Sequence, residues 1–487
     1  MSTEEPNAAA SGAAEIDAGR SGSAARTDAA PPHLDWEGFG FDTRQVHAGE
    51  YADRNSGLRV PPIALSAGYV FDDFEDGVAR FGGRSDWRGA ASTSRGEVDA
   101  FTESEPAPVY SRQGNPTNNV AEQRLASLEG GTVSVAVSSG QAAISAALFA
   151  LAGQGDHIVS TASIYGGTRI LFGRSFKRFG IAFDYVWDAA DDAEWERAIR
   201  PETKAIYTET IPNPRNDITD LRRIAAVAAR YNLPLVVDNT VGTPALIRPV
   251  EHGANIVVHS TTKFLTGHGA AVGGAVVDGG NFDWAAAERA GRSYPLITAA
   301  PRPGLASMLD RFGDGAYARA VREAVVNDIG PTLSPFHGFL LHQGMETLSL
   351  RMRQHVDSSL EIAAWLEQQP EVESVDYAGL PSSPLHELAA RDYAGRTGSV
   401  FGVTVRGGVD GARAFFDGLR VFSRMTGIGD TRSMVLHPLT STHSTFPDEL
   451  NARLGITPGL LRLSVGLETP EDLIADLRGG LAAVARR

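Results

Sequence analysis

Residues 256–269 read IVVHSTTKFLTGHG, and residues 235–240 before them read LVVDNT. Each stretch begins with a short apolar run and then turns polar. The first run ends at Asp238, and the second leads through small polar residues to Lys263. Apolar runs that alternate with helical stretches predict parallel strands, whose carboxyl ends meet at one edge of a sheet. We therefore expect a carboxylate and an amine to lie close together at that edge.

The same alternation extends from about Thr132 to Asp278 and predicts an α/β fold with a mostly parallel sheet covered by helices on both faces. After about Gly304 the order of apolar runs and helical stretches changes to a pattern typical of a smaller α+β domain. We expect strands at 133–137, 157–160, 181–186, 205–209, 235–238, 256–259, 272–277, 400–405 and 461–465. Helices are expected at 218–231, 411–419 and 470–484, with a long helical region at 340–366.

The sequence pattern predicts four segments in the chain. Residues 1–34 contain few large apolar side chains and are expected to form a disordered tail. Residues 35–110 form an N-terminal arm with a surface excursion at 82–107, residues 111–304 the large domain and residues 305–487 the C-terminal α+β domain. The tail has neither the apolar core of a secretory signal nor the acid-poor composition of a transit peptide, which favours a cytoplasmic protein.

Composition excludes several classes of function. The chain has 44 Lys and Arg against 59 Asp and Glu, a net charge of −15, so we expect neither a nucleic-acid nor a membrane partner. It contains no cysteine, which excludes disulfides, thiolate-bound metals and a thiol nucleophile. His259, His268 and His437 are scattered without a metal-binding spacing, so no metal is expected.

The residues around Lys263 predict a cofactor. A partly desolvated lysine amine is a nucleophile suited to imine chemistry. Ser260 and Thr262 can donate to phosphate oxygens, and a second polar turn, SSGQ at 138–141, opens a helix whose N-terminal N–H groups favour phosphate. A phosphate cradle, an amine and the Asp238 carboxylate together indicate pyridoxal 5′-phosphate (PLP), with the carboxylate keeping the pyridine nitrogen protonated.

At this point the chain resembles the Cys/Met-metabolism PLP-dependent enzymes of fold type I, over about residues 40–487. The resemblance implies the aspartate aminotransferase-like fold of PLP-dependent transferases. It rests on seven motifs in order: YSRQGNPT (110–117), SSGQAA (138–143), SIYGG (163–167), ETIPNP (209–214), VVDNT (236–240), HSTTKFLTGHG (259–269) and LRLSVGLE (461–468).

The resemblance also implies roles for single residues. Lys263 would link to PLP and then move protons, Asp238 would pair with the pyridinium, and the Tyr165 ring would stack on the cofactor. Asn213 would bond the phenolic oxygen and lie near the substrate carboxylate, which Arg462 would bind in a fork. The implied cofactor-binding residues are Lys263, Asp238, Tyr165, Gly140, Gln141, Ser260, Thr262, Asn213, Tyr110 and Arg112.

In this family Tyr110 and Arg112 resemble residues that reach the phosphate of the neighbouring subunit, with Tyr110 also a catalytic base. The resemblance therefore implies a homo-oligomer in which segment 35–110 completes the partner's site. It implies dimers that share active sites and assemble into a tetramer.

Within the family, the chain resembles the O-acetylhomoserine sulfhydrylase branch. The resembling features are GGNFDW (279–284) after GHG, and VHAGE (46–50) with GIGDTRS (427–433). Gly167 stands where similar γ-lyases carry cysteine. The implied reaction replaces the acetate of O-acetyl-L-homoserine by sulfide to give L-homocysteine, or by methanethiol to give methionine, in methionine biosynthesis.

Two departures from this branch concern the substrates. Residues 64–69 read ALSAGY in place of a segment like YQTTSY, and Gly427 replaces Asn or Ser. Cystathionine γ-synthase and γ-lyase chemistry therefore remain alternatives. A nicotinamide-dependent dehydrogenase is disfavoured because no G-x-G-x-x-G follows an early strand, and a non-catalytic scaffold is disfavoured because Lys263 and Asp238 are both present.

Overall fold

A computed structural model describes residues 38–50, 58–81 and 108–486 of the chain. The expected tail at 1–34 and the expected excursion at 82–107 lie outside these described residues. In the described part, no helix is both long enough and apolar enough to cross a membrane.

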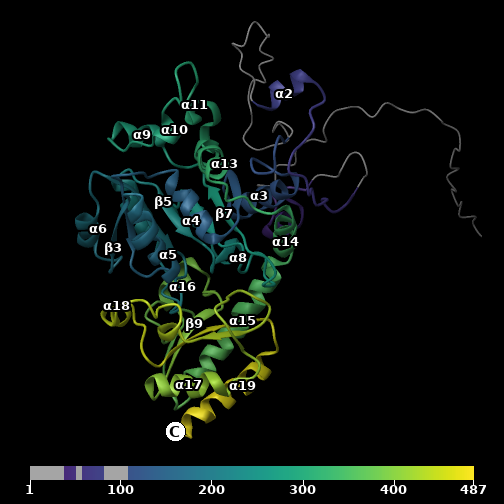
Figure 1. The fold of residues 1–487 in the computed structure, drawn as a ribbon. Helices are drawn as coiled ribbons and strands as arrows, with labels where there is room; N and C mark the ends of the chain where they lie inside the picture. The colour runs from purple at the N-terminus through teal and green to yellow at the C-terminus, as the bar shows by residue number, and fades with distance from the viewer. Residues whose placement is uncertain (1–37, 51–57, 82–107, 487) are drawn as a thin grey trace, which may run out of the picture. The chain divides into compact units, whose positions relative to one another are not determined.

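The large sheet has seven strands in the order β1-β7-β6-β5-β4-β2-β3 (Figure 1). Strands β2 to β6 pair in parallel, and β7 runs antiparallel to both β1 and β6. The prediction of a mostly parallel sheet is therefore confirmed. The strands are β1 (Val133–Val137), β2 (His157–Thr161), β3 (Ala182–Val186), β4 (Thr203–Glu209), β5 (Leu235–Asp238), β6 (Ile256–His259) and β7 (Gly274–Asp278).

Both faces of the large sheet are buried at its central strands, because β5, β6 and β7 are apolar over most of their length. Val236 of β5 belongs to the core under α4 (Gly140–Phe149), whereas the next residue, Val237, belongs to the opposite core under α3 (Pro116–Glu129) and α7 (Leu221–Arg230). Burying each such side chain contributes about 1.5–3 kcal/mol. This double burial explains why the strands read as continuous apolar runs.

The second sheet has the order β10-β11-β12-β9-β8 and lies in the C-terminal part of the chain (Figure 1). Helices α15, α17 and α19 pack with its apolar face around a third core that includes Phe401 and Leu463. Its strands and main helices are β8 (Val372–Asp376), β9 (Val400–Val405), β10 (Ser423–Arg424), β11 (Met434–Leu436), β12 (Leu460–Ser464), α15 (Leu348–Leu366), α17 (Gly408–Gly418) and α19 (Pro470–Ala485).

Several elements differ from the expectations. Strands β8, β10 and β11 were not expected, because they are short and only part of β8 is apolar. The region 340–366 contains two helices, α14 (Pro335–Met345) and α15. Helix α7 begins at Leu221 rather than at 218, because the Asp220 side chain accepts the Arg223 N–H at 3.1 Å and caps the helix there.

The remaining helices are short connecting elements. They are α1 (Phe41–His47), α2 (Phe74–Arg80), α5 (Gly166–Ile170), α6 (Asp192–Ala198), α8 (Thr243–Leu246), α9 (Trp284–Arg289), α10 (Pro295–Thr298), α11 (Met308–Phe312), α12 (Ala316–Ala320), α13 (Asn327–Ile329), α16 (His386–Asp392) and α18 (Asp448–Arg453).

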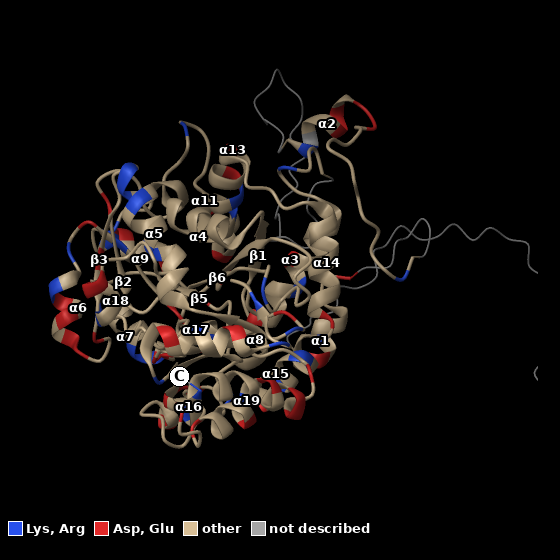
Figure 2. Cartoon of the chain, turned by 60° about the horizontal axis from the view of Figure 1, so that its bottom comes forward, with Lys and Arg blue, Asp and Glu red and all other residues tan. Residues whose placement is uncertain are grey.

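Charged residues of both signs are interspersed in the view of Figure 2. The acidic α6 illustrates the pattern, because Asp192 pairs with Arg223 at 3.0 Å and with Arg230 at 3.2 Å. Such exposed pairs contribute about 0–1 kcal/mol each. The negative charge of Asp192 is thus paired locally with two arginines.

Asp278 gives the fold a pH dependence that can be measured. The carboxyl lies at the end of β7 and accepts the N–H groups of Gly280 and Ala318, both at 2.9 Å, so it ties the sheet to α12. Burial raises the pKa of Asp278 to about 7. The native state therefore holds a proton that the unfolded chain has lost between about pH 4 and 7, and this group's contribution to stability falls as pH rises through that window.

We predict that Asp278→Asn loses this dependence. The difference in melting temperature between wild type and variant should shrink when the pH is raised from about 5 to about 7.5, because only the wild type must ionise a buried acid. Asp283→Asn, at an exposed helix cap, is the matched control and should show a constant difference. A constant difference for Asp278→Asn as well would contradict the assignment.

Candidate active site

One cavity of about 270 Å³ lies at the carboxyl ends of β4, β5 and β6. Its walls are the first turn of α4, the loops after the three strands and, from the C-terminal part of the chain, Thr426, Ile428 and Arg462. Parallel strands end at one edge, which explains how segments distant in sequence meet here. The predicted site residues that line the cavity are Gly140, Gln141, Tyr165, Asn213, Asp238, Ser260, Thr262, Lys263 and Arg462.

Lys263 lies in the turn after β6, where its backbone N–H donates to the Ser260 carbonyl at 3.3 Å. Its side chain is partly buried. Burial, together with the positive charge of Arg462, lowers the pKa of the Lys263 amine. Because the neutral amine is the reactive form, the lowered pKa suits Lys263 for imine formation and proton transfer.

Asp238 ends β5 and is only 9% exposed. Its Oδ1 accepts the Thr240 N–H at 2.9 Å and its Oδ2 accepts the Tyr207 hydroxyl at 3.4 Å. Burial raises the pKa of Asp238, so a cationic partner in the cavity would stabilise its charged form.

A buried contact between a histidine and a carboxylate lies behind this edge of the sheet. His259 Nε2 is 2.6 Å from Glu129 Oε1, and both side chains are fully buried. The same Glu129 oxygen accepts the Asn239 side-chain N–H at 2.9 Å. The pair links α3 to the residues that follow Asp238 and precede Lys263, and it explains His259 without a metal.

The first turn of α4 faces the cavity. Ser139 caps the helix by accepting the Ala142 N–H at 3.1 Å, while the N–H groups of Gly140 and Gln141 belong to the turn that has no intrahelical acceptors. A Cβ at Gly140 would lie 2.6 Å from the Ser260 Cβ, so only glycine allows these two segments to approach. The turn is thus suited to an anion such as phosphate.

Thr262 is already engaged within the protein. Its hydroxyl donates to the Gly273 carbonyl at 3.1 Å and accepts the Gly273 N–H at 3.0 Å. The Thr240 hydroxyl, which also lines the cavity, accepts the Ser260 N–H at 2.8 Å. Thr262 would therefore have to exchange one of these bonds to donate to a phosphate.

Arg462 of β12 is buried at the opposite wall. It donates to Asn213 Oδ1 at 3.3 Å and to the carbonyls of Thr426 and Gly427 at 2.9 Å each. Burial lowers its pKa to about 10. The backbone carbonyl at position 427, which any residue there would supply, orients Arg462, a side chain shaped to bind a carboxylate. Tyr165, 40% exposed, presents its ring to the same cavity.

Tyr110 and Arg112 do not line this cavity within the described residues of the chain. Tyr110 is 45% exposed, and the Arg112 guanidinium lies 5.5 Å from the centre of its ring. Arg112 also donates to Asn327 Oδ1 at 2.6 Å. Their implied role toward a neighbouring subunit stays a prediction.

Ser139, Glu209 and Thr240 are among the cavity-lining residues that received no role from the sequence. Each lies inside a quoted motif. The signal that could have indicated them is their position, because each one ends or directly follows a predicted strand at the edge where ligands bind.

Comparison with known families identifies the chain. A model of the Cys/Met metabolism PLP-dependent enzyme family matches residues 42–482. The chain belongs to this PLP-dependent family. The fold and the cofactor implied by the resemblance are therefore confirmed.

Similar proteins in the family share almost the whole length of this PLP-dependent chain. An O-acetyl-L-homoserine sulfhydrylase of Corynebacterium glutamicum is 41% identical over 446 residues, which cover 92% of this chain and 98% of the relative. An O-succinylhomoserine sulfhydrylase of Pseudomonas aeruginosa is 38% identical over 459 residues, which cover 94% of this chain and 99% of the relative. A crystal structure from Campylobacter jejuni that contains N′-pyridoxyl-lysine-5′-monophosphate is 31% identical, with a TM-score of 0.82 over 91% of this chain and 100% of that one.

The cavity residues fit PLP. Asp238 offers a buried carboxylate to the ring nitrogen, the first turn of α4 with Ser260 offers donors to the phosphate, and Lys263 offers the amine. PLP supplies an electron sink that stabilises negative charge at the substrate α-carbon. The assignment of single residues to PLP atoms remains a prediction.

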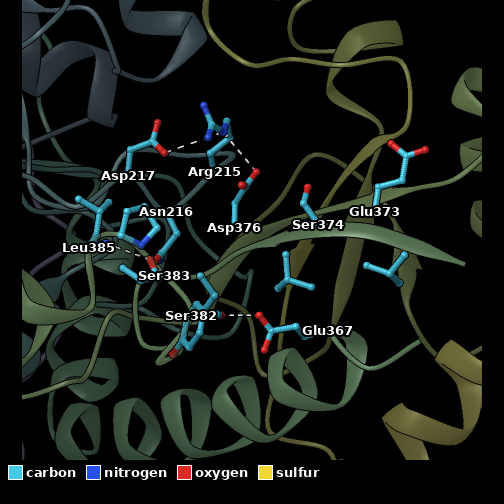
Figure 3. Close-up of a pocket in the computed structure, with 15 residues that line it drawn as sticks. Arg215, Asn216, Asp217, Glu367, Glu373, Ser374, Asp376, Ser382, Ser383 and Leu385 are labelled. Carbon is cyan, nitrogen blue, oxygen red and sulfur yellow. Dashed lines mark hydrogen bonds and ion pairs between the residues drawn. The ribbon is translucent and has the colours of Figure 1, made fainter. Parts of the chain in front are cut away.

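A second cavity of about 300 Å³ lies where the loop after β4 meets β8 (Figure 3). Arg215 Nε is 3.2 Å from Asp376 Oδ2 and 3.9 Å from Asp217 Oδ1, and Ser382 donates to Glu367. These charges pair across the cavity, as the dashed lines show. We interpret the pairs as contacts that hold the loop after β4 against the second sheet.

Glu50, His342 and Glu346 lie close enough together to be considered as metal ligands, away from the cavity. The fully buried Arg124 lies among them, with Nη2 3.0 Å from Glu50 Oε1 and Nη1 3.5 Å from Glu346 Oε1. Its guanidinium already balances the acidic charge. The expectation that the protein uses no metal stays a prediction.

Replacing Lys263 tests the cofactor site. We predict that the wild type purified with PLP shows an absorbance band at the edge of the visible range, and that Lys263→Ala loses it, because Lys263 is the one amine among the described residues that line the cavity. Lys177→Ala, at an exposed lysine, is the control and should keep the band. A band that persists in Lys263→Ala would show that another group holds PLP.

Proposed function

We propose that this PLP-dependent enzyme replaces the acetate of O-acetyl-L-homoserine by sulfide, giving L-homocysteine and acetate. With methanethiol the product would be methionine, so the enzyme would act in methionine biosynthesis. The observation that carries the proposal is the 41% identity to an O-acetyl-L-homoserine sulfhydrylase over 98% of that protein.

The geometry of the cavity supports an amino-acid substrate. The side chains of Arg462, which is buried, and Asn213 can bind an α-carboxylate on one wall. The positive charge of Arg462 is close enough to Lys263 to lower the pKa of its amine. An amino acid held in this way would direct its α-carbon toward the Lys263 Nζ, which can accept and return protons because its pKa is lowered.

The γ-carbon chemistry needs a nucleophile from solution. The chain contains no cysteine, so sulfur must enter as the second substrate. Apolar side chains, among them Ile144, Val241 and Ile428, line part of the cavity and can exclude water from a small sulfur nucleophile. A sulfide or methanethiol acceptor is consistent with this lining.

A matrix of substrates tests the proposal. We predict the highest kcat/KM for O-acetyl-L-homoserine with sulfide, compared with the O-succinyl and O-phospho donors and with methanethiol and cysteine as acceptors. Lys263→Ala is the inactive control. Preference for cysteine would indicate a cystathionine γ-synthase, and release of a keto acid without any acceptor would indicate a γ-lyase. Preference for the succinyl donor would overturn the choice of acyl group.

We also infer that the enzyme is a homo-oligomer whose subunits share active sites, with dimers pairing into a tetramer. The segment 58–81 exposes large apolar side chains, including Leu65 (75%), Val70 (89%) and Phe74 (75%). A contiguous exposed apolar surface is typical of a protein interface. Tyr110 pairs with this segment through a bridge to Gly68, so covering the surface with a second copy would bring Tyr110 and Arg112 to that copy.

Mixed oligomers test whether Arg112 acts across the interface. Arg112→Ala and Lys263→Ala should each have little activity alone. Co-expressed in equal amounts, the two variants should pair at random, so half of the dimers are mixed. One of the two sites is intact in each mixed dimer, so the whole mixture should have about a quarter of wild-type activity. A mixed dimer as inactive as either variant would show that Arg112 serves its own chain.

A further inference from the structure

Glu209 is a buried acid of the cavity that the reaction described above does not use. It ends β4 and is 4% exposed. Its Oε1 accepts the backbone N–H of Tyr165 at 2.7 Å. It therefore contacts the residue whose ring is expected to stack on PLP, although the two residues lie on different strand-to-helix connections.

Glu209 and Asp238 are direct neighbours in the sheet. They are register partners in the parallel pair β4–β5, so their side chains leave the same face at adjacent strands, about 4.8 Å apart along the hydrogen-bonding direction. Both are buried. Two buried carboxylates on adjacent strands repel each other when both are ionised, which favours a proton on one of them.

The surroundings decide which acid keeps the proton. Asp238 accepts hydrogen bonds from Thr240 and Tyr207, and the charge of His259 also works to lower its pKa. For Glu209, burial and the charge of Asp238 raise the pKa well above its usual value, and the Tyr165 N–H is the group that opposes this shift. Lys263 lines the same cavity. The proton therefore belongs on Glu209.

Tyr165 is contacted at both its backbone and its ring. Its ring lies directly on Gly167, where an added Cβ would come 2.4 Å from the ring Cε1. Gly167 thus leaves room for the ring, and the bond to Glu209 holds the backbone from which the ring extends. Loss of either contact would let the Tyr165 ring move, and PLP is expected to stack on this ring.

We propose that Glu209 is a positioning residue of this site: as a neutral acid bonded to the Tyr165 N–H it fixes the stacking ring, and its neutrality leaves Asp238 as the single carboxylate that meets the PLP ring nitrogen. The proposal rests on PLP binding by the family and not on the choice of acyl donor or sulfur acceptor. Its test can therefore fail or succeed independently of the proposed reaction.

The test measures PLP affinity by titrating apo-enzyme, with no substrate present. Glu209→Gln keeps a neutral side chain of the same length with an oxygen that can accept the Tyr165 N–H. The PLP affinity of this variant should therefore stay within about twofold of wild type. Glu209→Leu has a similar size and no acceptor, so its affinity should fall about tenfold or more. The control is Glu194→Leu, which removes the acceptor of the Trp187 N–H away from the cavity and should leave affinity unchanged.

Two further readouts distinguish positioning from a general structural role. In a double-mutant cycle, Glu209→Leu should have little additional effect on PLP affinity once Tyr165 is replaced by alanine, because the two act as one unit. The pH midpoint of the PLP absorbance change should be the same in wild type and Glu209→Gln. If the leucine variant does not fold, Glu209→Asp, whose carboxyl is one methylene shorter, should show the loss of affinity instead.

Three results would overturn the proposal. Unchanged PLP affinity in both Glu209→Leu and Glu209→Asp would show that the bond to Tyr165 positions nothing. Additive effects of Glu209→Leu and Tyr165→Ala on PLP affinity would show that Glu209 does not act through Tyr165. A midpoint in Glu209→Gln lower by about one pH unit would show that wild-type Glu209 carries a charge, because removing an anion destabilises a nearby cation.

Discussion

The parallel pairing of β4, β5 and β6 determines where the residues of the candidate active site lie. The register joins Glu209 to Asp238 and Asp238 to Val258, so the strands end at the same edge with their last side chains in fixed order. Because side chains alternate along a strand, a shift of one residue would turn Asp238 into the opposite core. The apolar runs buried on both faces of the sheet resist such a shift.

Burial at this edge disfavours the charged form of each ionisable group. It lowers the pKa of Lys263 and Arg462 and raises that of Asp238 and Glu209. A free site of this kind is costly in free energy, and a ligand that carries a phosphate, a ring nitrogen and a carboxylate offers complementary charge for it. The strongly acidic composition and a local anion site are therefore compatible, because the site is built from buried groups rather than from the surface.

Much of the fold and the site could be predicted from the sequence. The apolar runs located the strands of the large sheet, and Asp238 and Lys263 stood out because each follows such a run. Short elements such as β8 and β11 were missed. Strand β8 is mixed in polarity and exposure, and β11, although fully buried, has only three residues, too few to show a period. Glu209 was missed for another reason: although it ends a predicted strand as Asp238 does, its contacts with Tyr165 and Asp238 exist only in the folded chain.

The sequence by itself determined the family, the cofactor and the absence of a protein thiol, because these depend on which residues are present and in what order. The tertiary structure decided which groups act together. It paired Glu209 with Asp238, placed Tyr165 over Gly167 and brought Arg462 from the second sheet to Lys263. Such relations depend on register, burial and close approach between distant segments, and these arise only when the chain is folded.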